Sequence, residues 1–218
     1  MNVASSLIEQ QIRRWEQAQK ESPNRVRPCV ALSRLPGTPA VEIGQLVAEQ
    51  LGYGFFDIEI VDEIARSEGV GREIVSHLDE HVRHGLDRWL LDTFRGSTWT
   101  ERDYLHALGR VISGLAARGS AVIMGRGATF LLDETQALRI QIVGSRTRRI
   151  ERLAAARSLP PAGAEATLEA EEEERSRFLG EFAEMPDSPL HFDLVVNTDF
   201  RDPHYWASLI AATVRRLD

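Results

Sequence analysis

The chain has 218 residues, 43% of them hydrophobic, and a formal net charge of −7. This length and apolar content suit one domain with a real core, no apolar run approaches the roughly 18 residues of a membrane span, and the negative charge argues against a general nucleic-acid binder. The single cysteine, Cys29, excludes an internal disulfide and a cysteine-based metal cluster.

Residues 3–20 are predicted to form a helix, and residues 21–28 have the composition of a linker. We therefore divide the chain into an N-terminal helix and linker, residues 1–27, and a larger unit, residues 28–218. The helix would pack either on this chain or on a second copy, which would make a homodimer. Since the first residues lack a signal-peptide core, we expect a cytoplasmic protein.

From Pro28 onward, short apolar runs alternate with helical patterns. The predicted strands are 30–32, 55–56, 121–124, 138–143 and 194–196. The predicted helices are 40–51, 58–67, 71–94, 101–118, 146–157, 164–183 and 203–216. This alternation predicts an α/β fold, a parallel sheet with helices on both faces. Ligands bind such sheets at the carboxyl ends of strands, which directs attention to the polar and glycine residues found there.

The stretch SRLPGTPAVE, after the first predicted strand, has the outline of a phosphate-binding loop. A full loop, G-x-x-x-x-G-K-[ST], holds phosphates and Mg²⁺ with backbone N–H groups, a lysine and a hydroxyl. Here Pro39 has no N–H, and Ala40 and Val41 stand where the lysine and hydroxyl are expected. Thr38 is predicted to cap the next helix, with Pro39 at its first position. A phosphate site at the helix N-terminus and an inherited turn without phosphate both remain open.

The order and spacing of five blocks of sequence are informative: SRLPGTPAVEIGQLVAEQLGYGFFD, SAVIMGRGATFLL, RIQIVGSRTRRIERL, EEERSRF and FDLVVNT. Together they resemble the cytidylate-kinase-like proteins of the P-loop nucleoside monophosphate kinase group, over roughly residues 28–215. The resemblance implies phosphoryl transfer from ATP, with Mg²⁺, to CMP or a related monophosphate. It also implies an acceptor-side helical region at 57–118 and lid-like helices at 146–183.

The same resemblance implies residues for the acceptor nucleotide. Arg126, between Gly125 and Gly127, would grip its phosphate or base edge, because the planar guanidinium binds at two points and the glycines allow a close approach. The alternative is a glycine-bordered turn with an ion-paired arginine. Asp57 would either orient the acceptor or cap the following helix.

Other arginines would serve the transferred phosphate by this resemblance. Arg149, Arg152 and Arg175 would close over it and neutralise its charge. The alternative is a set of solvated ion pairs, for example Glu171 with Arg175. The donor nucleotide would bind at Arg34, Gly37, Thr38, Pro39, Ala40 and Val41. Arg34 is the nearest cation that could replace the missing lysine, since the chain has one lysine, Lys20.

Two further sets of residues carry weaker signals. His77, His81 and His84 come closest to metal-ligand spacing, but there is no H-E-x-x-H motif, so we predict no protein-bound metal cluster. Trp89 and Trp99 would stack on an acceptor base, or pack in the core or at an interface.

Two functions remain open at this point. The first is the kinase, with nucleoside mono- and triphosphates as partners and neither nucleic acid nor membrane. The second is an inactive kinase-like domain that binds a nucleotide or another anion in regulation or assembly. The arginines favour the first function, and the departure at Pro39, Ala40 and Val41 favours the second.

Overall fold

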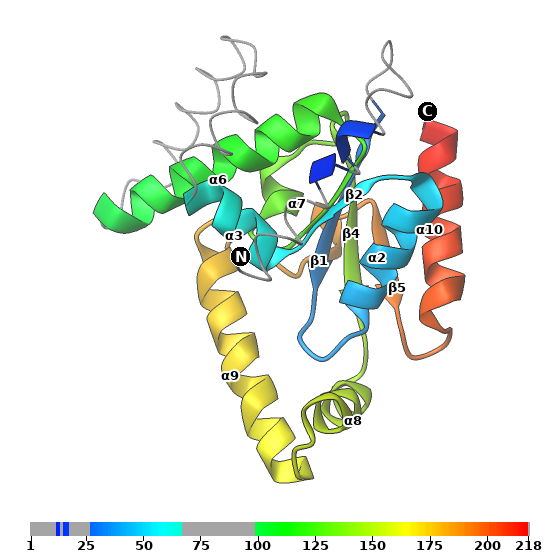
Figure 1. Cartoon of the computed structure of the whole chain (residues 1–218). Helices are drawn as coiled ribbons and strands as arrows, with labels where there is room; N and C mark the ends of the chain where they lie inside the picture. The colour runs from blue at the N-terminus through cyan, green and yellow to red at the C-terminus, as the bar shows by residue number, and fades with distance from the viewer. Residues whose placement is uncertain (1–11, 14, 18–26, 67–98, 218) are drawn as a thin grey trace.

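The computed structural model describes residues 12–13, 15–17, 27–66 and 99–217 (Figure 1). Within these ranges, five parallel strands form one sheet in the order β2-β3-β1-β4-β5. The strands are β1 (Cys29–Arg34), β2 (Gly54–Phe56), β3 (Ala121–Met124), β4 (Ala137–Val143) and β5 (Leu194–Asn197). The predicted α/β fold with a parallel sheet is confirmed.

Helices cover both faces of the sheet (Figure 1). On one face lie α2 (Ala40–Leu51) and α10 (Pro203–Leu217), which pack against each other. On the other lie α3 (Ile58–Arg66) and α6 (Trp99–Arg118). Successive residues of the central strand, β1, point to opposite faces of the sheet: Val30 packs with α2 and α10, and Ala31 packs with α3 and α6. Because both faces are covered, β1 is apolar from Cys29 to Leu32, and its first polar residue, Ser33, lies at the cleft.

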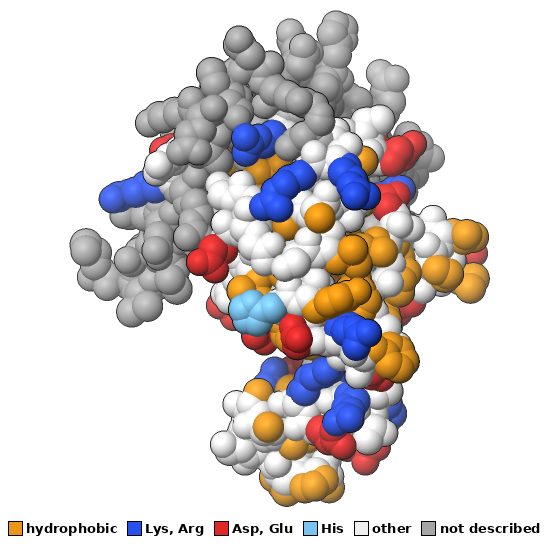
Figure 2. Space-filling view, turned by 90° about the vertical axis from the view of Figure 1, so that its right-hand side faces the viewer, with side chains coloured by type: hydrophobic (Ala, Val, Ile, Leu, Met, Phe, Trp, Pro, Cys, Tyr) orange, Lys and Arg blue, Asp and Glu red, His pale blue; other side chains and the backbone are white. Residues whose placement is uncertain are grey.

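Two helices project from the carboxyl end of β4. These are α8 (Arg146–Arg157) and α9 (Pro161–Gly180), which form a hairpin around Leu153, Ala164 and Leu168. In Figure 2 this hairpin is a narrower lobe on which basic and acidic side chains lie side by side. Helix α9 begins three residues before its predicted start, because a proline fits the first turn of a helix.

A short helix and a single 3₁₀ turn complete the described elements. Helix α7 (Ala128–Leu131) follows β3 after a three-residue turn, and η1 (Pro189–His191) precedes β5. None of the helices in the described ranges combines the length and the apolar character needed to cross a membrane.

The described part of the N-terminal segment packs on this chain. Trp15 is buried in the core, its Nε1 donates a hydrogen bond to the carbonyl of Gly119 at 2.7 Å, and its ring meets the ring of Phe56 edge to face. The domain boundary at residue 27 and self-association through this helix stay predictions. The predicted helix 71–94, the three histidines and Trp89 lie outside the described residues, as does the side chain of Trp99.

Candidate active site

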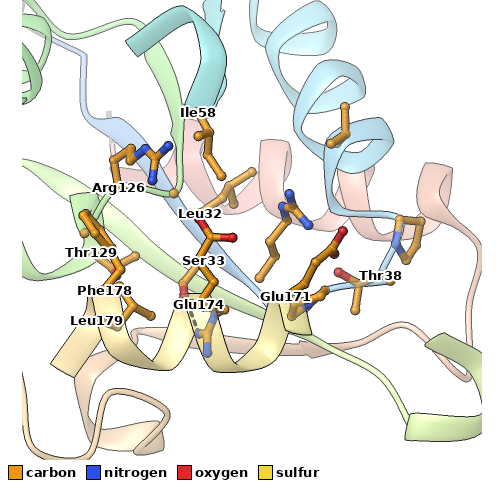
Figure 3. Close-up of a pocket in the computed structure, with 18 of the residues that line it drawn as sticks. Leu32, Ser33, Thr38, Ile58, Arg126, Thr129, Glu171, Glu174, Phe178 and Leu179 are labelled. Atoms are coloured by element: carbon orange, nitrogen blue, oxygen red, sulfur yellow. Dashed lines mark hydrogen bonds between the residues drawn. The ribbon is translucent and has the colours of Figure 1, made fainter. Parts of the chain in front are cut away.

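The carboxyl ends of β1 and β3 open into a cleft of about 1150 Å³ between the sheet and the α8–α9 hairpin. In Figure 3, Arg126 and Ile58 lie at one end of this cleft and Thr38 at the other, with Glu171 and Glu174 of α9 between them. Most of the predicted site residues line it: Arg34, Gly37, Thr38, Pro39, Val41, Gly125, Arg126, Gly127, Arg152 and Arg175.

The loop between β1 and α2 is built by its own hydrogen bonds. The N–H of Leu35 donates to the carbonyl of Ile142 at 3.0 Å, and the hydroxyl of Thr38 donates to the carbonyl of Leu35 at 2.7 Å. Pro39, not Thr38, occupies the N-cap of α2. The predicted cap was therefore wrong, because the Thr38 hydroxyl closes the turn within the loop. The side chain of Ala40 is buried in the core under α2 and does not reach the cleft.

Arg34 stands at the end of β1, where the strand meets the cleft. Its Nε is buried and has no hydrogen-bond partner within the described ranges. Burial lowers the pKa of this guanidinium, the charge of Glu171 raises it, and the charges of Arg175 and Arg157 lower it. An arginine still stays charged in a protein. A buried charged donor without a partner is costly, so this position suits an incoming anion.

Arg126 is held firmly at the opposite end of the cleft. Its Nε and Nη2 donate to the two carboxylate oxygens of Asp62 at 2.8 and 2.6 Å. The hydroxyl of Tyr104 donates to the same carboxylate at 2.7 Å, and the guanidinium lies 5.4 Å from the centre of the Phe178 ring. The ion pair that the alternative interpretation required is present, and it leaves Nη1 outside the pairing with Asp62.

Arg149 lies behind the loop rather than in the cleft. Its side chain is 8% exposed; Nη1 donates to the carbonyl of Pro36 and to Glu172, and Nε donates to the carbonyl of Gly144. The start of α8 also packs closely against the loop. A Cβ at Gly37 would lie 2.7 Å from the Arg149 carbonyl oxygen, so only glycine fits there without a shift. Arg149 therefore supports the loop and could act on a ligand only through it.

Arg152 and Arg175 reach the cleft from the hairpin, each with a partner. Arg152 donates to the carbonyl of Thr198 at 2.9 Å and to its hydroxyl at 3.2 Å. Arg175 donates to both carboxylate oxygens of Asp187, at 3.0 and 2.6 Å, and to the hydroxyl of Ser33 at 3.2 Å. The pair of Glu171 with Arg175 considered from the sequence does not form; Glu171 pairs with Arg157 instead.

Asp57 serves as a helix cap. Its carboxylate accepts the N–H of Ile60 at 3.0 Å, at the first turn of α3. It is not among the residues that line the cleft. Of the two roles considered for Asp57, the structure shows the contact that capping requires.

The cleft lining suits phosphate groups better than it suits a bare metal ion. Six arginines face four glutamates there: Arg34, Arg126, Arg152, Arg157, Arg175 and Arg177 against Glu42, Glu171, Glu174 and Glu181. Within the described ranges, no group of three histidine, cysteine or acidic side chains could hold a metal. Mg²⁺ is commonly bound through substrate phosphates and one or two carboxylates, so these residues fit a nucleotide that brings its own metal.

The sequence missed the partners that hold the arginines. Tyr104 and Phe178 line the cleft, and Asp62 and Asp187 hold two of its arginines, but each of the four lies in an ordinary helical or loop pattern. Asp62 is separated from Arg126 by 64 positions, so no local spacing indicates the pair.

The all-parallel sheet with this strand order, together with a cleft at its carboxyl edge beside a loop and a helix N-terminus, is a fold of the P-loop kinase type. The chain belongs to the cytidylate kinase-like family, whose sequence profile matches residues 29–200. None of the curated protein sequences matches it significantly.

Solved structures are similar to this chain at low sequence identity. An uncharacterized protein from Eubacterium ventriosum ATCC 27560 is 14% identical with a TM-score of 0.69, over 87% of this chain and 99% of that chain. The shikimate kinase from Acinetobacter baumannii in complex with shikimate is 15% identical with a TM-score of 0.46, over 87% and 94% of the two chains. The shikimate kinase from Bacteroides thetaiotaomicron is 15% identical with a TM-score of 0.46, over 88% and 98%.

Proposed function

We propose that the protein transfers the terminal phosphoryl group of ATP to CMP or a related nucleoside monophosphate. One observation carries the proposal: arginines from one strand, one turn and two helices meet in a single cleft beside the loop and the N-terminus of α2. They are Arg34, Arg126, Arg152 and Arg175. Phosphoryl transfer requires mainly positioning and charge neutralisation, which arginines provide.

The two ends of the cleft suit different parts of the reaction. Donor phosphates would bind at the loop, near the N-terminus of α2, with Arg34 in place of a lysine. The acceptor would bind at the other end, where Arg126 offers Nη1, the terminal nitrogen that does not pair with Asp62, beside the ring of Phe178. Arg152 and Arg175 would neutralise the transferred group between them. Mg²⁺, carried by ATP, would add positive charge at the donor phosphates.

A second function has a specific observation in its favour. Pro39 takes the N-cap without an N–H to donate, and Asp187 already occupies both terminal nitrogens of Arg175. A chain with these features could bind a nucleotide or another anion without transferring phosphate. In that case the protein would be a kinase-like regulatory or assembly module.

A transfer assay separates the two functions. Purified protein, free of contaminating kinases, is incubated with labelled ATP, Mg²⁺ and a panel of nucleoside monophosphates that includes CMP. We expect transfer to one acceptor and a loss of roughly 100-fold or more in Arg126→Ala. Arg139→Ala is the matched control, because Arg139 forms a comparable bidentate pair with Asp193 outside the cleft. Nucleotide binding without transfer to any acceptor would favour the inactive module.

A further inference from the structure

The ion pair of Asp62 with Arg126 fixes the direction of the guanidinium as well as its charge. Asp62 on α3 accepts from the Nε–Nη2 edge of Arg126, and its side chain is 14% exposed. Tyr104 on α6 donates to the same carboxylate and so holds Asp62 in turn. The paired edge of Arg126 therefore faces the α3–α6 wall, and Nη1 is left for the cleft.

The backbone around Arg126 is also held in an unusual conformation. Gly125, Arg126 and Gly127 have φ values of 81°, 49° and 71°, so three consecutive residues are left-handed. For arginine this costs roughly 1–2 kcal/mol, and such strain concentrates at functional sites. A Cβ on either glycine would lie 2.6 Å from a neighbouring side chain, Ile58 at Gly125 and Phe182 at Gly127. The close packing of Ile58 and Phe182 thus restrains the backbone of the turn, and Asp62 restrains the side chain of Arg126.

The packing of α3 does not depend on this ion pair. Val61 and Ile64, on the same helix, are fully buried in the core beside α6. The ion pair lies at the cleft, outside this apolar core, because Arg126 lines the cleft. The distinctive effect of Asp62 is therefore on the direction of Arg126.

We propose that Asp62, supported by Tyr104, is a positioning residue that aims the Nη1 side of Arg126 at the phosphate of the acceptor. The assignment to the acceptor rests on the proposed function. The positioning itself rests on the geometry of the pair. A neutral side chain of the same shape at position 62 would leave the arginine in place but free to turn, because it accepts at one atom where the carboxylate accepts at two.

The chain offers a matched control for this role. Arg139 and Asp193 form an equally bidentate pair, with side chains 21% and 28% exposed, and neither residue lines the cleft. Asp62→Asn and Asp193→Asn therefore remove the same kind of interaction from two places. Tyr104→Phe removes the supporting hydrogen bond and keeps both members of the pair.

The first experiment follows the Nε–Hε signal of Arg126 by NMR, assigned with Arg126→Lys, while inorganic phosphate and then CMP are added. In the wild type and in Asp193→Asn we expect a rigid signal that shifts with ligand. In Asp62→Asn we expect a mobile signal and about tenfold weaker CMP binding, with ATP binding unchanged. Tyr104→Phe should lie between these results. The inference is wrong if Asp62→Asn keeps the rigid signal and the wild-type CMP affinity, or if Asp193→Asn loses as much affinity.

This design keeps the inference separate from the proposed function. If the wild type transfers no phosphate but its Arg126 signal still responds to phosphate only when Asp62 is present, the kinase proposal fails and the positioning role of Asp62 stands. If the wild-type signal responds to neither phosphate nor CMP, the positioning role is overturned. In an active enzyme, Asp62→Asn should raise the KM for the monophosphate and leave the KM for ATP unchanged.

Discussion

The guanidinium of Arg149 donates a hydrogen bond to the carbonyl oxygen of Pro36 at 3.2 Å, which joins the start of α8 to the loop between β1 and α2. The same side chain pairs with Glu172 of α9. One buried arginine therefore ties the loop, α8 and α9 together. Through Arg149, the α8–α9 hairpin therefore helps to set the conformation of the loop.

Replacing Arg149 should destabilise the whole protein. Arg149→Ala leaves the carbonyls of Pro36 and Gly144 and the carboxylate of Glu172 without their donor, so we expect a loss of about 3–5 kcal/mol in the free energy of unfolding. Thermal and urea unfolding measure the loss. Arg148→Ala is the control, because Arg148 is 61% exposed and pairs with Glu151 on the surface. Equal stability of the two variants would contradict this role.

Replacing Arg34 should have the opposite effect on the ligand-free protein. Arg34→Met removes a buried charged donor that has no partner within the described ranges, so we expect the unliganded protein to gain about 1 kcal/mol or more in stability. The same change should abolish the rise in Tm that ATP causes in the wild type. Differential scanning fluorimetry with and without ATP measures both effects. A variant that is less stable and still responds to ATP would show that Arg34 is structural.

Restoring a backbone donor at position 39 should strengthen phosphate binding. Pro39 stands at the N-cap of α2 with φ of −79°, which alanine also adopts, and Pro39→Ala supplies the missing N–H. One added hydrogen bond to a charged phosphate predicts roughly tenfold tighter ATP binding. Titration calorimetry checks the affinity. Unchanged binding in Pro39→Ala, with unchanged stability, would place the donor phosphates away from this loop.

Burial of Cys29 predicts a loss of stability at alkaline pH. Burial raises the pKa of its thiol to about 12 in the folded protein, and the backbone hydrogen bond from Ala121 opposes this rise. The unfolded chain releases the thiol proton near pH 9.0, so above that pH the unfolded state binds fewer protons than the folded state. The contribution of the buried thiol to the free energy of unfolding is fully present below pH 9.0. It is lost as the pH rises toward 12, by at most about 1.4 kcal/mol per pH unit.

Urea unfolding across this pH range measures the effect of Cys29. Wild type should lose stability with pH more steeply than Cys29→Ala, since the difference between the two slopes isolates the thiol from other groups that titrate there. Iodoacetamide should also fail to label Cys29 until the protein unfolds. Parallel slopes, or rapid labelling of the folded protein, would contradict the burial of this thiol.

The elements of the sheet could be predicted because their signals are local. The run at 121–124 is a strand with those bounds, the run at 138–143 begins one residue earlier, and the helix expected at 203–216 ends one residue later. Apolar runs and helical periodicity report which faces are buried, and in a parallel sheet covered on both faces that information is nearly sufficient. The family resemblance adds the order of the blocks, and the match over residues 29–200 confirms it.

The candidate site could be predicted only in outline. The sequence placed Arg34, Arg126, Arg152 and Arg175 at strand ends and on the hairpin, but it did not predict which groups hold the last three of them. Those partners lie far along the chain; Ser33, for example, is 142 positions from Arg175. The sequence also left open whether the N-terminal helix packs on this chain or on a second copy, and the structure buries Trp15 in the core of this chain. Ion pairs and core contacts of this kind depend on tertiary packing, which leaves no periodic signal in the sequence.

The most direct measurement is a crystal structure of the protein with CMP and a non-hydrolysable ATP analogue bound together. The account predicts that the terminal phosphate of the analogue lies within hydrogen-bond distance of Arg34 at the loop, and that the CMP phosphate contacts the Nη1 side of Arg126. The two phosphates should face each other between Arg152 and Arg175. Nucleotide bound elsewhere, or bound in the cleft without a contact to Arg34, would contradict a phosphotransferase site at this position.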